Sequence, residues 1–139
     1  MADVRRVTGD FAVAPQLGPE DLGDLKAMGF QNIINNRPDE EAPDGAKSTD
    51  MRAAAAAAGL TYVHAPFVGQ PTPEAVEVAA KAVGPTLAYC RSGTGSTTAW
   101  ALAQAKTGAM SAEDIIEAAA GAGYNISGLK ETLRRLGAK

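Results

Sequence analysis

Short apolar segments alternate with amphipathic segments along most of this chain. Asn32–Asn35, residues 61–65 and Thr86–Tyr89 are apolar runs of strand length. Between them, apolar residues recur at three- and four-residue spacing, as they do from 72 to 83, which is typical of helices with one buried face. The alternation predicts an α/β fold, with a mostly parallel sheet flanked by helices.

The two ends of the chain complete this pattern. Residues 4–7 and 11–14 are predicted to be two strands joined by a turn at residues 8–10, which gives the sheet an antiparallel N-terminal edge. Ser48 or Thr49 is expected to cap the second helix, and Thr72 and Ser111 to cap two later ones. Helices are expected near residues 19–28, 48–58, 72–83, 97–107, 111–120 and 127–136. Because no repeat or linker divides the chain, residues 1–139 are predicted to form one domain.

Composition and charge narrow the classes of function. The 139 residues include 45% hydrophobic and 21% charged residues, which is ordinary for a globular protein. A net charge of -3 offers no basic surface, so we expect no nucleic-acid partner. No apolar run reaches the ~20 residues that span a bilayer, and the N-terminus lacks the apolar stretch of a secretory signal. We therefore expect no membrane association and a cytoplasmic location.

The chain contains one cysteine and one histidine. A lone cysteine cannot form an internal disulfide or a cysteine-only metal site, and His64 with scattered carboxylates makes no metal cluster. No metal and no cofactor are therefore predicted. Alternation along residues 61–65 places His64 on the same face as Tyr62, which favours a hydrogen-bonded sheet histidine over a catalytic base.

The strongest chemical signal lies between Thr86 and Ser96. A buried strand ends at Cys90, and a loop rich in glycine, serine and threonine leads directly into a helix. The amides and dipole at a helix N-terminus can hold an anion and favour a thiolate over a thiol. Cys90 is therefore predicted to be a nucleophile beside an oxyanion-binding loop; the alternative is a small apolar residue at a strand end.

The residues around Cys90 are the predicted anion-binding groups. Arg91 either touches the anion or remains a solvated loop cation. Gly93 allows the backbone to approach a ligand closely. Ser96 is expected to be the hydroxyl nearest the thiolate, although it could equally cap the helix. The remaining predicted members of this loop are Ser92, Thr94 and Gly95.

A second loop, which follows the strand Asn32–Asn35, is expected at the same edge of the sheet. Arg37 either supplements the anion site or forms an exposed ion pair with Asp39. Asp39, Glu40 and Glu41 are the nearest candidates for a general acid, and each could instead be a solvated carboxylate. Of the three, Asp39 is our predicted catalytic residue.

These motifs together resemble the bacterial beta-lactamase hydrolase-like phosphatase family. That family is a branch of the cysteine-dependent phosphatases, and its members are also called sulfur transferases. The resemblance implies a dual-specificity-phosphatase-like fold and a nucleophilic Cys90. In that superfamily the loop corresponding to residues 66–71 often holds the acid, and here it contains no Asp or Glu. The matching segments are residues 16–22, 29–30, 33–39, 62–66, 89–96 and 122–124.

The cysteine loop departs from the family pattern at one position. The family loop reads Cys-Arg-Ser-Gly-Thr-Arg-Ser, and this chain has Gly95 where the family has its second arginine. The arginine at position 95 was either lost naturally or removed by engineering, and both events would leave the same sequence. The family places this arginine five residues after the cysteine, whereas tyrosine and dual-specificity phosphatases place it six after and have His where this chain has Tyr89. The shorter loop resembles that of the rhodanese sulfurtransferases.

Three hypotheses about function follow from these residues. The first is a phosphatase-like hydrolase that works through a cysteinyl-phosphate and is weakened by Gly95. The second is sulfur transfer through a Cys90 persulfide, which needs no acid to protonate a leaving alkoxide. The third is a module that binds an oxyanion or a phosphorylated ligand without turnover. The expected ligand is a small anionic or phosphorylated substrate, and the expected assembly is a monomer or homodimer.

Overall fold

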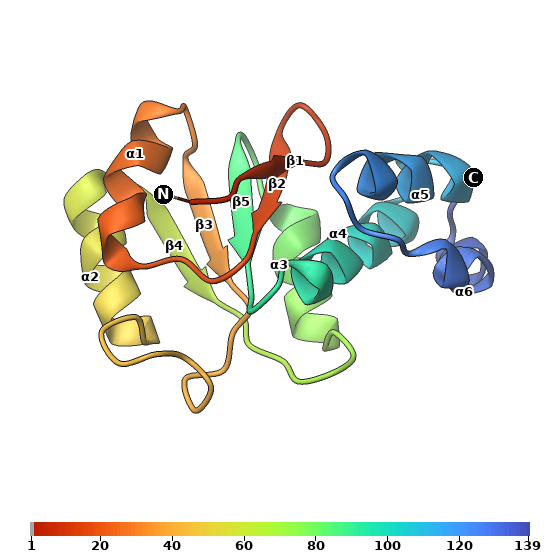
Figure 1. Ribbon diagram of the computed structural model, residues 1–139. Helices are drawn as coiled ribbons and strands as arrows, with labels where there is room; N and C mark the ends of the chain where they lie inside the picture. Colours follow the sequence, from red (N-terminus) through yellow and green to blue (C-terminus); the bar gives the residue numbers. More distant parts are fainter. Residues whose placement is uncertain (1) are drawn as a thin grey trace.

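The chain folds around a five-stranded sheet in the order β1-β2-β5-β3-β4 (Figure 1). The structure is a computed structural model that describes residues 2–139. β1 pairs antiparallel with β2, and the other neighbours are parallel, which confirms the predicted mostly parallel sheet and its antiparallel N-terminal edge. The strands are β1 (Arg5–Arg6), β2 (Phe11–Ala14), β3 (Asn32–Asn35), β4 (Thr61–His64) and β5 (Thr86–Tyr89).

Helices cover both faces of the sheet. α1 and α2 lie on one face, α3 and α4 on the other, and α5 and α6 pack outside α4 (Figure 1). The predicted first and last helices each begin with a 3-10 turn. The helices are α1 (Leu22–Ala27), α2 (Ser48–Ala58), α3 (Pro73–Lys81), α4 (Thr94–Thr107), α5 (Ala112–Gly121) and α6 (Lys130–Leu136), and the 3-10 turns are η1 (Pro19–Asp21) and η2 (Ser127–Leu129).

The sheet separates two hydrophobic cores. Phe11 and Val13 pack with Trp100 of α4 in one core. Ala12 faces the opposite side, where it packs with Met51 of α2. This division follows from the two-residue period of a strand, which sends successive side chains to opposite faces. Both faces of the central strands are therefore buried, as expected for a parallel sheet.

Two of the three predicted helix caps are confirmed. Thr72 and Ser111 cap α3 and α5, and each hydroxyl accepts a backbone N–H at 3.1 Å. The prediction of Ser48 or Thr49 as the cap of α2 is wrong, because Ser48 is already the first helical residue. Its N–H is instead bound at 2.8 Å by the Asp39 carboxylate. A side chain from the preceding loop satisfies this otherwise free donor.

The four parallel strands end at the same level. Ala14 is in register with Tyr89, Tyr89 with Asn35, and Asn35 with His64. Cys90 and the loops that follow the other strands therefore lie along one edge of the sheet. Ligands of open α/β sheets bind beyond this carboxyl edge.

Candidate active site

Cys90 opens onto a cavity of about 200 Å³ at the carboxyl edge of the sheet. The residue is partly buried, and its Sγ accepts the N–H of Gly93 at 3.2 Å. A donor aimed at sulfur stabilises the thiolate more than the thiol. The cavity is lined by Asn36, Arg37, Pro38, Glu41, Phe67, Val68, Gly69, Cys90, Arg91 and Gly95.

Gly93 is required here for two independent reasons. Its φ of +92° lies in the left-handed region, which side-chain-bearing residues rarely adopt. A Cβ at this position would also lie 2.1 Å from the Tyr124 hydroxyl oxygen. Only glycine therefore allows the tight turn that returns the backbone N–H to the sulfur.

The loop leads directly into the N-terminus of α4. Thr97 donates its backbone N–H to the Gly93 carbonyl at 3.0 Å and its hydroxyl to the same oxygen at 2.8 Å. Gly95 and Ser96 precede this first helical hydrogen bond. Their backbone N–H groups are therefore among those at a helix N-terminus that have no partner within the helix. Together with the helix dipole, they form a local environment suited to an anion.

The three hydroxyls of the loop have separate roles. Those of Ser92 and Thr94 are exposed and lie 3.1 Å from each other. The Ser96 hydroxyl is buried and donates to Asn36 Oδ1 at 2.8 Å, whereas the sequence suggested a bond to the thiolate. Ser96 therefore ties α4 to the loop after β3.

Asn36 connects three strand ends through buried hydrogen bonds. Its N–H donates to the Tyr89 carbonyl at 2.9 Å, and its side-chain Nδ2 donates to the Ala65 carbonyl at 2.9 Å. Its Oδ1 accepts from Ser96. Asn36 thereby holds the loops that follow β3 and β4 and the start of α4 in fixed positions around the cavity.

The substitution Asn36→Ala is expected to destabilise the protein by about 2–3 kcal/mol, because it leaves buried partners at Ala65 and Ser96 without hydrogen bonds. Urea unfolding measures this change, and the exposed amide variant Gln70→Ala provides the control, with an expected effect within about 0.5 kcal/mol. A loss below about 0.5 kcal/mol for Asn36→Ala would contradict the role we assign to this network.

Arg37 lines the cavity from the loop after β3. Its Nη1 donates to Gln16 Oε1 at 2.7 Å, while its Nε is buried and has no hydrogen-bond partner among the described residues. The Gln16 N–H in turn donates to the Arg91 carbonyl at 3.2 Å. Gln16 therefore links the Arg37 side chain to the cysteine loop.

The Arg37 backbone is fixed on both sides. Its N–H donates to Asn35 Oδ1 at 2.8 Å, and its carbonyl oxygen lies 2.8 Å from His64 Nε2. His64 is thus a hydrogen-bonded histidine at a strand end, the interpretation that the sequence favoured. Its contact orients an arginine that lines the cavity.

The three loop carboxylates are separated by the fold. Asp39, our predicted acid, binds the N–H of Ser48 and does not line the cavity. Glu41 does line it, and it is the one carboxylate among its lining residues. Periodicity cannot predict this difference, because it depends on the path of an irregular loop that brings Asp39 to the start of α2 and Glu41 to the cavity.

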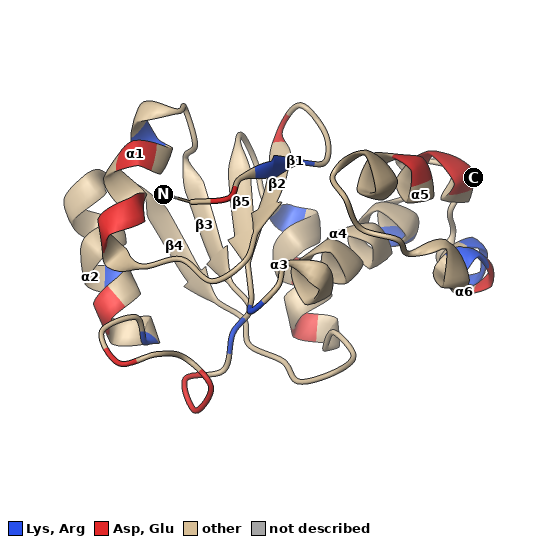
Figure 2. Ribbon diagram, viewed as in Figure 1, with Lys and Arg blue, Asp and Glu red and all other residues tan. Residues whose placement is uncertain are grey.

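Basic side chains converge where β3 and β5 end. Figure 2 shows two basic segments below these strands, which correspond to the loops carrying Arg37 and Arg91. Arg91 is exposed and Arg37 is partly buried. Two guanidinium groups and one carboxylate therefore line the cavity, an excess of positive charge that favours an anionic ligand.

Phe67 covers the position of the missing arginine. A Cβ added to Gly95 would lie 3.1 and 3.3 Å from two ring carbons of Phe67 and 3.6 Å from the Cys90 sulfur. Glycine thus permits the ring to pack directly over the start of α4. The sequence offered no signal for this contact, since Phe67 belongs to a loop without periodicity.

Tyr89 does not face the cavity. It is fully buried in the core beneath α1 and α2, and burial raises its pKa. Its phenol therefore stays neutral at physiological pH and adds no charge beside Cys90.

Tyr124 is the contact to the cysteine loop that sequence reasoning missed. Its hydroxyl donates to the Ser92 carbonyl at 2.9 Å. The sequence signal that could have indicated this contact was the family match at residues 122–124.

Within residues 2–139, no group of three or more His, Cys, Asp or Glu side chains could hold a metal ion, and no helix has the length and apolar character of a membrane span.

Comparisons with known proteins identify the family. The profile of the family described as "Beta-lactamase hydrolase-like protein, phosphatase-like domain" matches residues 3–107. A beta-lactamase hydrolase-like protein of Agrobacterium fabrum is 33% identical over 135 residues, which cover 94% of this chain and 31% of that protein. The chain thus spans about a third of the length of this curated relative.

Solved structures agree with this assignment. The crystal structure of a candidate phosphatase from Neisseria meningitidis Z2491 matches with a TM-score of 0.77 and 29% identity, covering 95% of this chain and 96% of that one. PTPMT1, solved in complex with PI(5)P, matches with a TM-score of 0.71 over 96% of both chains; at 18% identity it shows the fold alone. The fold is that of the dual-specificity-like cysteine phosphatases, as predicted, and the chain belongs to the phosphatase-like domain family of beta-lactamase hydrolase-like proteins.

Proposed function

We propose that this chain, as a single phosphatase-like domain, hydrolyses phosphate monoesters with Cys90 as its nucleophile. The observation that carries the proposal is the position of Cys90 Sγ, which accepts an amide N–H and opens onto a cavity lined by two arginines. A dianionic phosphoryl group suits this charge distribution. Membership in a phosphatase-like family supports the same reaction class.

In the first step, the Cys90 thiolate attacks phosphorus in line with the ester oxygen. A sulfur–phosphorus bond forms while the phosphorus–oxygen ester bond breaks, and the loop amides stabilise the equatorial oxygens. The leaving alkoxide takes a proton from Glu41, the carboxylic acid that lines the cavity. We assign this role to Glu41 in place of Asp39, whose carboxylate already caps α2.

In the second step, water attacks the cysteinyl-phosphate. The Glu41 carboxylate takes a proton from this water, the sulfur–phosphorus bond breaks, and inorganic phosphate leaves with the thiolate restored. One carboxyl group thus serves as acid and then as base, and both steps balance without a cofactor.

Arg37 supplies the charge that the loop lacks at Gly95. Its guanidinium donates to Gln16, and its backbone is held by Asn35 and His64 at the neighbouring strand end. Its Nε is buried and has no hydrogen-bond partner among residues 2–139, so the guanidinium keeps an unused donor. Arg37 therefore acts as the principal clamp on the phosphoryl oxygens, with Arg91 as an exposed second cation.

The substitution Arg37→Ala tests this assignment. We expect kcat/KM for aryl-phosphate hydrolysis to fall by about 100-fold or more, the usual cost of removing one donor to a transition-state oxyanion. Arg135→Ala, which removes an exposed arginine from α6, should leave the rate unchanged. Equal activity of the two variants would contradict the role of Arg37.

Parallel assays separate this function from its competitors. Thiosulfate-to-cyanide sulfur transfer by the unmodified chain, without aryl-phosphate hydrolysis, would replace the proposal by the persulfide hypothesis. Phosphate binding without either turnover would replace it by a binding module.

A further inference from the structure

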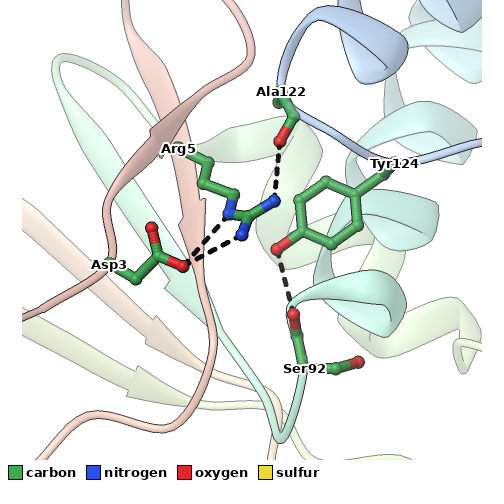
Figure 3. Close-up of polar contacts among 5 residues, drawn as sticks. All are labelled: Asp3, Arg5, Ser92, Ala122 and Tyr124. Carbon is green, nitrogen blue, oxygen red and sulfur yellow. Dashed lines mark hydrogen bonds and ion pairs between the residues drawn. The ribbon is translucent and has the colours of Figure 1, made fainter.

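A hydrogen bond from a distant part of the chain holds the cysteine loop. The Tyr124 hydroxyl, from the segment after α5, donates to the Ser92 carbonyl at 2.9 Å (Figure 3). Tyr124 does not line the cavity, and its side chain is largely buried. It therefore contacts the loop from outside the cavity.

The carbonyl of Ser92 and the N–H of Gly93 belong to the same peptide unit. In a planar trans peptide these two groups point in opposite directions. The carbonyl points to Tyr124, and the N–H points to Cys90 Sγ at 3.2 Å. The orientation of one group therefore sets the orientation of the other.

Gly93 makes this orientation easy to lose. Glycine adopts positive and negative φ about equally, so the peptide before it can rotate with little steric penalty. A rotated peptide would turn the Ser92 carbonyl oxygen toward the sulfur and remove the N–H donor. An oxygen lone pair facing a thiolate disfavours the charged form.

Tyr124 is itself held by the N-terminal strand. The Arg5 guanidinium lies over its ring, 5.5 Å from the centroid, and donates to the Ala122 carbonyl at 3.4 Å (Figure 3). Two further bonds join Arg5 to Asp3 at 3.0 and 3.2 Å. Burial raises the pKa of Tyr124 despite the opposing effect of Arg5, so the phenol remains a proton donor at neutral pH.

We propose that Tyr124 is a positioning residue that locks the Ser92–Gly93 peptide with its N–H directed at Cys90. The lock stabilises the thiolate and keeps the carbonyl oxygen away from the anion site. The proposal rests on the proposed function in one respect, since it takes the Cys90 thiolate to be the reactive species. Its test does not require turnover.

The substitution Tyr124→Phe removes the donor and keeps the ring. We expect the pH of half-maximal Cys90 alkylation by iodoacetamide to rise by about one pH unit, the effect of losing one charge-assisted hydrogen bond. The other charged groups that line the cavity, Arg37, Arg91 and Glu41, are unchanged in this variant. Tyr89→Phe is the matched control, because its hydroxyl is buried in the core away from the cavity and has no hydrogen-bond partner among the described residues.

Two results would overturn the lock. One is a Tyr124→Phe profile equal to that of the unmodified chain, with a normal melting temperature. The other applies if the variant does not fold. In that case the unmodified chain is labelled with ¹⁵N, and a Gly93 amide resonance that does not shift as Cys90 ionises would contradict the lock. A raised alkylation midpoint in a chain without phosphatase activity would support the lock and refute the proposed function.

Discussion

Replacing Cys90 by serine is expected to lower aryl-phosphate hydrolysis by about 10⁴-fold or more, the scale of losing a catalytic nucleophile. A serine hydroxyl remains protonated at neutral pH unless a base removes its proton. The described residues that line the cavity include no histidine to do so. Steady-state hydrolysis measures the loss, and rapid acid quench should trap a phosphorylated intermediate in the unmodified chain alone.

The same variant should still bind inorganic phosphate, because Arg37, Arg91 and the amides of α4 remain in place. Calorimetry tests this binding, and its survival separates loss of the nucleophile from loss of the site. Hydrolysis by Cys90→Ser within tenfold of the unmodified rate would place the nucleophile elsewhere.

The second large effect is a gain of activity. Gly95→Arg in a Phe67→Ala background is expected to raise kcat/KM for aryl phosphates by about 100-fold over Phe67→Ala alone, because a bidentate guanidinium would reach the equatorial oxygens from the loop. Gly95→Arg alone should give a smaller gain. A Cβ at position 95 lies 3.1 Å from the Phe67 ring, which must move before the arginine can reach the anion.

Gly95→Gln in the same background controls for steric effects. It adds a long neutral side chain that also relieves the low helix propensity of glycine, so stability should not fall in either variant. The coupling between positions 67 and 95 is read from the double-mutant cycle. If the glutamine and arginine variants have equal activity, the missing arginine at position 95 does not limit catalysis.

The spacing of apolar residues along the chain was sufficient to predict most of the fold. Two-residue alternation in strands and three- to four-residue recurrence in helices depend on neighbours in the sequence, so Thr86–Tyr89 and the helix capped by Thr72 were predictable. This reasoning fails where the end of a helix is exposed to solvent. Met28 follows the spacing of the α1 face and is nevertheless 49% exposed at the C-terminal cap of that helix.

The loops show where local reasoning fails. Asp39 and Glu41 are two residues apart, and chain position gave no basis for distinguishing a helix cap from a carboxylate that lines the cavity. Ser96 was predicted to contact the sulfur, whereas its hydroxyl turns to Asn36, 60 residues earlier. Such outcomes depend on which elements meet in space.

By itself, the sequence determined the α/β alternation and the strand–cysteine–loop–helix stretch around Cys90, because both depend on residues close together in the chain. It also indicated the family, through motifs spread from residue 16 to residue 124. Tertiary structure alone decided which groups surround the sulfur. Arg37 contacts Gln16 across 21 positions, and Tyr124 contacts Ser92 across 32. Arg37 meets Gln16 because parallel strands bring the loops after β2 and β3 to one edge of the sheet, and Tyr124 reaches Ser92 because α5 packs against α4. No periodicity in the sequence encodes which side chains meet at these places.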